Sequence, residues 1–102
     1  MHYLICYDIE NDRKRNRIAK SLLRHGCERV QKSVFVAVNL EPKHLNLLLR
    51  DLKRFFPDLP PPGAPADQVL VVPLPNEQAG KIVALGYNNA IPDFEKILSK
   101  IL

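Results

Sequence analysis

The sequence lacks long apolar runs and is poor in cysteine, and each absence excludes a class of protein. No run of about 18 apolar residues occurs, so we expect no membrane-spanning helix. Only Cys6 and Cys27 are present, which implies no disulfide framework and favours a reducing cytoplasm. The first residues lack the charged region and the small-residue cleavage site of a signal peptide. We therefore expect a cytoplasmic protein.

Several common catalytic and ligand-binding motifs are also missing. His2, His25 and His44 do not have the spacing of metal ligands. The four glycines are scattered and form no phosphate-binding loop. Neither Ser21 nor Ser33 has the flanking residues of a nucleophilic serine.

What the sequence does contain is enough apolar residues for one core and an uneven distribution of charge. Its 102 residues, 46% of them hydrophobic, predict one domain over 1–102. The net charge is +4, but between Arg13 and Lys32 eight basic residues stand against one acid, Glu28. That segment carries +7 and the rest of the chain −3, which favours a polyanionic partner such as nucleic acid.

Hydrophobic periodicity predicts alternating strands and helices. We expect strands over 2–9, 28–39 and 68–74, and helices over 13–25 and from Pro42 to just before Pro57. Further segments are a Pro-rich irregular connection over 57–66, a possible edge strand over 81–87 and a helical tail over 88–102.

This order predicts an α+β protein with a ferredoxin-like βαββαβ sheet and both helices on one face. The long second strand would fold back as a hairpin near Val36 to Leu40. The other sheet face would then be uncovered and half apolar, so we expect a homodimer formed sheet to sheet.

Successive side chains of the strand over 28–39 point to two faces of different composition. Val30, Val34 and Val36 share one face, whereas Arg29 and Phe35 share the other. One face belongs to the core. The face with Phe35 is polar near its start, so we expect it to contact solvent or another molecule.

Asp8 ends the first strand, where side chains project from the rim of a sheet. A carboxylate is a good ligand for Mg²⁺, which takes one or two carboxylates together with water and substrate phosphate. A two-fold dimer would bring two copies of Asp8 together around one ion. The alternative is that Asp8 only caps the turn that follows.

The first helix combines an apolar face with a cationic one. Four basic residues lie within about 60° of one another around the helix axis: Arg13, Arg17, Lys20 and Arg24. We call these four residues the cationic ridge. Together with the adjacent Lys14, they are candidates for contacts with nucleic-acid phosphates. A merely solvated face is the alternative. Arg15 lies off the ridge and would reach back toward Asp8, and Tyr7 and Phe35 would stack on bases or belong to the core or dimer interface.

Three segments of the sequence together resemble the second CRISPR-associated protein family, the small Cas adaptation protein. They are Tyr7-Asp8-Ile9, the helix start over 12–20, and residues 26–35, which include Gly26 and Phe35. The resemblance implies a prokaryotic, ferredoxin-like homodimer and a metal-dependent endonuclease of RNA or double-stranded DNA. It also implies a role in spacer acquisition, in which the protein bridges two dimers of the CRISPR integrase.

The resemblance also assigns roles to residues. It makes Asp8 the catalytic metal ligand for Mg²⁺, with Mn²⁺ as a substitute. The supporting catalytic residues are Tyr7, Arg15, Arg17, Arg29 and Phe35. We expect Arg29 on the uncovered sheet face. The Pro-rich connection and the extended C-terminal segment depart from the family pattern at the sheet edge.

Two other functions remain open. One is a non-catalytic dimeric scaffold that holds duplex DNA for the integrase and uses the cationic ridge only electrostatically. The other is an RNA-recognition-type module, but the Gly-aromatic run typical of that fold is absent.

Overall fold

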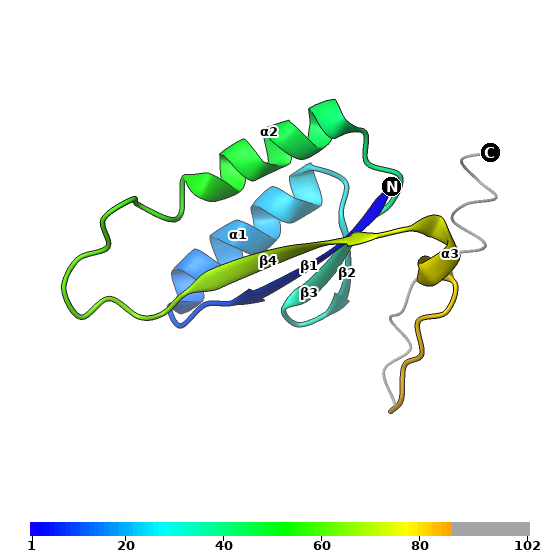
Figure 1. Ribbon diagram of the computed structural model, residues 1–102. Helices are drawn as coiled ribbons and strands as arrows, with labels where there is room; N and C mark the ends of the chain where they lie inside the picture. The colour runs from blue at the N-terminus through cyan, green and yellow to red at the C-terminus, as the bar shows by residue number, and fades with distance from the viewer. Residues whose placement is uncertain (87–102) are drawn as a thin grey trace.

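The computed structural model describes residues 1–86 and contains a four-stranded antiparallel sheet. Its elements are, in order, β1 (His2–Asp8), α1 (Asp12–Arg24), β2 (Glu28–Gln31), β3 (Val34–Ala37), α2 (Pro42–Lys53), β4 (Gln68–Leu74) and the short α3 (Asn76–Ala79). The strand order is β2-β3-β1-β4, and α1 and α2 cover the same face of the sheet (Figure 1). The expected ferredoxin-like order of elements is confirmed.

Alternation along the central strand β1 divides its side chains between two faces. Ile5 and Tyr7 point toward the helices and are buried in the main core, whereas Leu4 packs in a second cluster on the opposite face. In the sheet, Ile5 lies opposite Phe35 of β3 on one side and Val71 of β4 on the other. The main core therefore lies between the sheet and the helix layer.

Both helices bury one apolar stripe against this core. The buried residues on the helices are Ile18, Ala19 and Leu22 of α1 and Leu48 and Leu52 of α2. Ile18 and Ala19 lie four and three residues before Leu22, and Leu48 lies four residues before Leu52, so each set shares one helix face. The position of α1 is therefore fixed by its apolar side, and its charged side is left at the surface.

The ends of α1 follow from local chemistry. Asn11 is the N-cap, and its side-chain oxygen accepts a hydrogen bond from the backbone N–H of Lys14 at 2.9 Å. After the helix, Gly26 has a φ of 81°, a left-handed conformation that glycine adopts without strain. Both ends agree with the expected helix to within one residue.

The hairpin between β2 and β3 differs from the expectation. Its turn is Lys32-Ser33, and the fold-back expected near Val36 to Leu40 is wrong. Val36 and Ala37 instead pair with Leu4 and Tyr3 of β1, so this stretch continues the sheet. A β-bulge between Arg29 and Gln31 lets the chain reverse earlier without a glycine in the turn.

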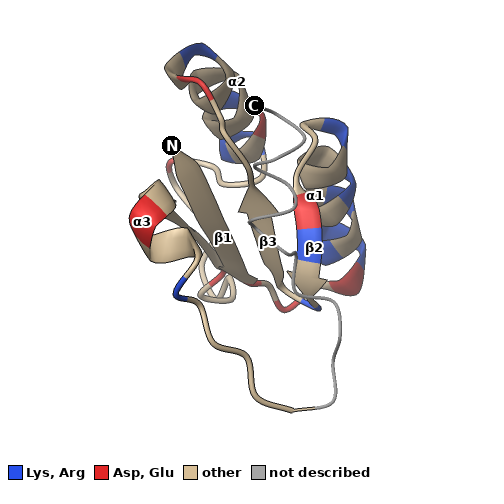
Figure 2. Cartoon of the chain, turned by 90° about the vertical axis from the view of Figure 1, so that its right-hand side faces the viewer, with Lys and Arg blue, Asp and Glu red and all other residues tan. Residues whose placement is uncertain are grey.

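Within residues 1–86, the sheet face opposite α1 and α2, which we call the open face, is only partly covered (Figure 2). Val30 and Val36 cluster there with Ala79 of α3, and all three are buried. On the same face, Leu70 and Val72 of β4 stay 53% and 43% exposed. The open face therefore presents apolar surface.

The remaining expectations concern the connections. Residues 57–66 form neither helix nor strand, as expected of a Pro-rich connection. The edge strand expected over 81–87 is not formed by residues 81–86, and the helical tail expected over 88–102 lies outside the described residues. None of the helices within residues 1–86 is long and apolar enough to cross a membrane.

Asp67 joins the start of β4 to the turn that follows Asp8. One carboxylate oxygen accepts a hydrogen bond from the backbone N–H of Glu10 at 3.0 Å. The other pairs with the Lys14 ammonium at 3.0 Å, and the Asp67 side chain is only 9% exposed. These bonds hold the pKa of Asp67 below its usual value, the contact with the Glu10 N–H being the larger cause.

We predict that Asp67 makes the fold sensitive to acid. A carboxyl whose pKa is lower in the folded state than in the unfolded state stabilises the folded state at pH values above its ordinary pKa of 3.8. This stabilisation disappears as the pH falls through the lowered pKa. Asp67→Asn should therefore lower the free energy of unfolding at pH 7, and its stability should fall less between about pH 5 and pH 2 than that of the wild type. Urea unfolding across this range measures both effects. Asp58→Asn, in the exposed connection, is the control and should keep the wild-type slope.

Candidate functional site

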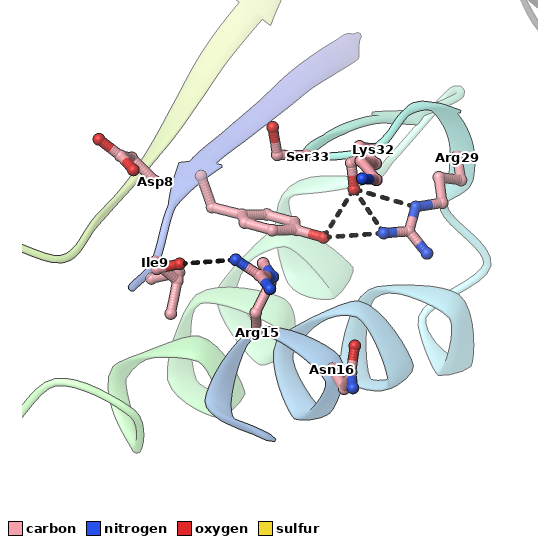
Figure 3. A pocket seen from close by; sticks show the side chains of 8 residues that line it. Asp8, Ile9, Arg15, Asn16, Arg29, Lys32 and Ser33 are labelled. Atoms are coloured by element: carbon pink, nitrogen blue, oxygen red, sulfur yellow. Dashed lines mark hydrogen bonds between the residues drawn. The ribbon is translucent and has the colours of Figure 1, made fainter. Parts of the chain in front are cut away.

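Asp8 is the last residue of β1 and is exposed. Alternation places its side chain on the open face, with Leu4 and Cys6, and it lies opposite Gln68 of β4. Its carboxylate points away from Arg15 and Arg29 (Figure 3). Asp8 is therefore free of cationic partners among the described residues and open to an external ligand.

A polar hollow of about 330 Å³ lies beside this strand end, mainly on the helix side of the sheet. Its lining comes from β1, α1 and the β2–β3 hairpin, and we call it the strand-end hollow: Tyr7, Asp8, Ile9, Arg15, Asn16, Arg29, Lys32 and Ser33. Three of these residues are basic. Asp8 belongs to the rim of the hollow, but its carboxylate is turned out of it (Figure 3).

The hairpin turn is held by two side chains that converge on one carbonyl. The Tyr7 hydroxyl and the Arg29 Nε each donate to the Lys32 carbonyl oxygen at 3.1 Å. Arg29 also contacts the Tyr7 hydroxyl at 3.4 Å, and its guanidinium lies 5.3 Å from the centre of the Phe35 ring. In this chain Tyr7, Arg29 and Phe35 thus form one contact group that fixes the turn.

Arg15 reaches the end of β1, as expected. Its guanidinium donates to the Ile9 carbonyl at 3.3 Å and pairs with Asp12, one turn earlier in α1. The Arg15 side chain is 40% exposed, so part of its guanidinium is available at the hollow. It therefore supports the strand end from the helix side.

The expected position of Arg29 and Phe35 is wrong. Both were expected on a face turned to solvent or another molecule, but Phe35 is fully buried in the main core beneath the helices. Arg29 lies opposite Phe35 in the hairpin and on the same face. The physical reason is volume: the aromatic ring fills the wide space between sheet and helices, while the smaller valines take the other face.

The cationic ridge is exposed along α1, where Figure 2 shows Lys and Arg gathered. Arg13, Arg17, Lys20 and Arg24 all lie at the surface. Lys14 does not join them, because it pairs with Asp67 and lies 4.6 Å from the centre of the Phe56 ring.

Three ridge residues line a second hollow, the α1–α2 groove, of about 490 Å³. The groove is lined by Arg17, Lys20, Ser21, Arg24 and His25 from α1 and its end, and by Asp51, Arg54 and Phe55 from α2 and its end. The other five lining residues, at positions 21, 25, 51, 54 and 55, were not predicted as site residues. The periodicity of the sequence predicts the apolar and polar faces of each helix separately. It does not indicate which residues of α2 lie beside α1.

The metal and thiol chemistry of residues 1–86 is limited. Within this range, no three His, Cys, Asp or Glu side chains are grouped so as to hold a metal ion. Cys6 and Cys27 are free thiols on opposite faces of the sheet. Burial raises the pKa of Cys27 to about 11, so this thiol stays protonated at neutral pH.

Curated relatives match much of the chain. The CRISPR-associated endoribonuclease Cas2 of Aeropyrum pernix is 35% identical over 86 residues, which cover 84% of this chain and 86% of that protein. The CRISPR-associated endoribonuclease Cas2 2 of Pyrobaculum aerophilum is 43% identical over 54 residues. That match covers 53% of this chain and 58% of the relative.

The fold agrees with a solved structure. Streptococcus pyogenes Cas2, in a crystal structure at pH 6.5, superposes with a TM-score of 0.67 at 20% identity. The superposition covers 84% of this chain and all of that one. The family model described as CRISPR associated protein Cas2 matches residues 1–82. With this sheet, its exposed strand-end aspartate and these matches, the chain belongs to the Cas2 family of CRISPR-associated proteins.

Proposed function

We propose that the chain is a metal-dependent endoribonuclease in which Asp8 holds the catalytic ion. The observation that carries the proposal is the exposed Asp8 carboxylate at the end of β1, turned away from the neighbouring guanidinium groups. The names of the relatives from A. pernix and P. aerophilum support this activity. RNA, rather than double-stranded DNA, is the substrate that these names favour.

The proposal includes a homodimer formed through the open face. Leu70 and Val72 leave apolar surface beside Leu4 and Cys6, and a second copy of the chain would cover it. Asp8 lies on this same face, so a two-fold axis near the strand end would bring two carboxylates together. One chain alone supplies a single carboxylate.

The donor set fits Mg²⁺, with Mn²⁺ as a substitute. Carboxylate oxygens are hard ligands, and Mg²⁺ keeps most of its waters, so one Asp8 from each protomer is a sufficient protein contribution. When bound there, the ion would supply Lewis acidity and a water of lowered pKa for phosphodiester hydrolysis. Asp8 would hold it on the open face, away from the helix layer.

The other predicted catalytic residues take supporting roles in this proposal. Tyr7, Arg29 and Phe35 fix the hairpin turn beside the strand end, and Arg15 holds the Ile9 carbonyl next to Asp8. They position Asp8 through the backbone and touch no reacting group. Arg17, in the α1–α2 groove, contributes to binding.

A non-catalytic scaffold is a second candidate, and one observation favours it. The cationic ridge lies on the helix layer, whereas Asp8 points to the open face. A duplex resting on the ridge would be held without approaching Asp8. In that role the dimer would bridge the CRISPR integrase during spacer acquisition, and the ridge would contact phosphates without reading sequence.

We predict that Asp8→Asn strongly reduces cleavage and leaves the fold intact. The substitution keeps the size of an exposed side chain but removes the negative charge that holds the ion. Cleavage of a labelled RNA with Mg²⁺ should fall on the order of 100-fold, the scale on which charge-stabilising groups act. The matched control is Asp58→Asn.

Two outcomes separate the candidate functions. Cleavage by Asp8→Asn at the wild-type rate, in a preparation free of contaminating nuclease, would contradict the nuclease. If spacer acquisition in cells also requires Asp8, the scaffold that uses only electrostatics is excluded.

We predict that Leu70→Asp dissociates the homodimer. A carboxylate at this position would place charge within the exposed apolar surface of the open face, and charged residues are depleted from the cores of interfaces. Sedimentation should show a rise in the dimer dissociation constant of about 10-fold or more, equal to about 1.4 kcal/mol. Leu59→Asp is the control, because Leu59 is 89% exposed in the Pro-rich connection. A wild-type chain that is monomeric at all concentrations would refute the shared site.

We predict that Tyr7→Phe loosens the hairpin turn. It removes the hydroxyl that donates to the Lys32 carbonyl, a bond worth about 1 kcal/mol of unfolding free energy. Arg29 keeps its bond to the same carbonyl, so the fold survives. The control is Tyr3→Phe, on the same face of β1 but away from Lys32. An unchanged urea midpoint for Tyr7→Phe would contradict the role of this contact.

A further inference from the structure

The α1–α2 groove has cations on both of its walls. Arg17, Lys20 and Arg24 come from α1, and Arg54 stands opposite them at the end of α2. Together they give four permanent positive charges against one acid, Asp51. A groove whose walls carry the same sign of charge attracts anions more strongly than a flat surface with the same charges.

Two of these cations are held in place by neighbouring side chains. The Arg17 guanidinium lies 5.7 Å from the centre of the Phe55 ring, which packs against the main core. Arg54 lies 3.7 Å from an Asp51 oxygen, and its side chain is 72% exposed. Both residues line the groove and are exposed, so their guanidinium groups keep donors available for a ligand.

Among the described residues that line the groove, Asp51 is the single acid, and it has two partners. His25 Nε2 lies 2.7 Å from one carboxylate oxygen, and Arg54 approaches the other. The hydrogen bond from His25 is the main reason why the pKa of Asp51 lies below its usual range. The carboxylate is therefore ionised at neutral pH, where it joins α2 to the end of α1 and repels any anion in the groove.

The groove and Asp8 are on different layers of the molecule. The groove lies between the two helices, whereas the Asp8 carboxylate points to the open face on the other side of the sheet. A strand bound in the groove is therefore not bound at the Asp8 of the same protomer. Binding and cleavage become separable properties of this chain.

We propose that the α1–α2 groove is a phosphate-binding site for a single nucleic-acid strand, and that Asp51 limits its affinity. A single strand fits because its backbone would be contacted from both walls, by Arg17 or Arg24 on one side and Arg54 on the other. The volume of the groove, about 490 Å³, is within the range of about 300–1,000 Å³ typical of ligand sites. This inference deepens the proposed function and rests on it for the choice of nucleic acid.

The test measures binding without cleavage. Full-length protein is titrated into a labelled 15-nucleotide single strand in EDTA, and fluorescence anisotropy is recorded at several salt concentrations. Arg54→Gln should weaken binding about 3- to 10-fold and reduce the salt slope by about 0.7, the value for one phosphate contact on a single strand. The control is Lys43→Gln, which removes the same charge at the far end of α2 and should change binding less than about 2-fold.

A second pair of variants tests whether Asp51 limits the affinity of the groove. Asp51→Asn should tighten binding about 3-fold or more, because it removes the negative charge that Asp51 places in the groove. Asp58→Asn changes the net charge equally and should leave the affinity close to that of the wild type. Arg24→Gln, on the exposed side of α1, repeats the test without disturbing the Asp51 pairs and should weaken binding.

The outcomes are decisive in each direction. Equal binding by Arg54→Gln and Lys43→Gln, or no gain for Asp51→Asn over Asp58→Asn, would overturn the groove as a binding site. A duplex that binds more tightly than the single strand, with the same loss in Arg54→Gln, would overturn the choice of a single strand. Asp8→Asn should bind normally in EDTA, so failure of the groove and failure of the nuclease give different results.

Discussion

The two-residue alternation of β1 is the constraint on which the rest of the structure depends. Ile5 and Tyr7 must face the helices, because they complete the core with Ile18 and Leu22 of α1. Asp8 then has to face the opposite side, since adjacent residues of a strand point to opposite faces. Packing of the core therefore determines the direction of the exposed Asp8 carboxylate.

The same constraint separates two chemical surfaces. The helix layer carries the cationic ridge and the α1–α2 groove, and the open face carries apolar residues that end at Asp8. The strand-end hollow lies between them, and its Tyr7 and Arg29 side chains are bound to the hairpin turn. The cationic ridge and the Asp8 carboxylate thus coexist in a small domain without pairing with each other.

Much of the fold was predictable because its signals are local. The N-cap at Asn11, the glycine after α1, Pro42 at the start of α2 and the order of elements can all be read from neighbouring residues. The hairpin was not, because its turn has no glycine and depends on a bulge and on pairing with β1. The face of Phe35 also escaped prediction, since the valines make the other face of its strand the more apolar one, and only the helices show which face is the main core.

The sequence by itself determined the composition of the site: an aspartate at the end of the first strand and a helix with aligned basic residues. It also placed Arg15 near that strand end, because the first turn of a helix lies beside the strand it follows. Only the tertiary structure decided which charges meet. It paired Lys14 with Asp67 and brought Arg54 and Asp51 beside α1, because contacts between helices depend on how the core packs and not on sequence spacing.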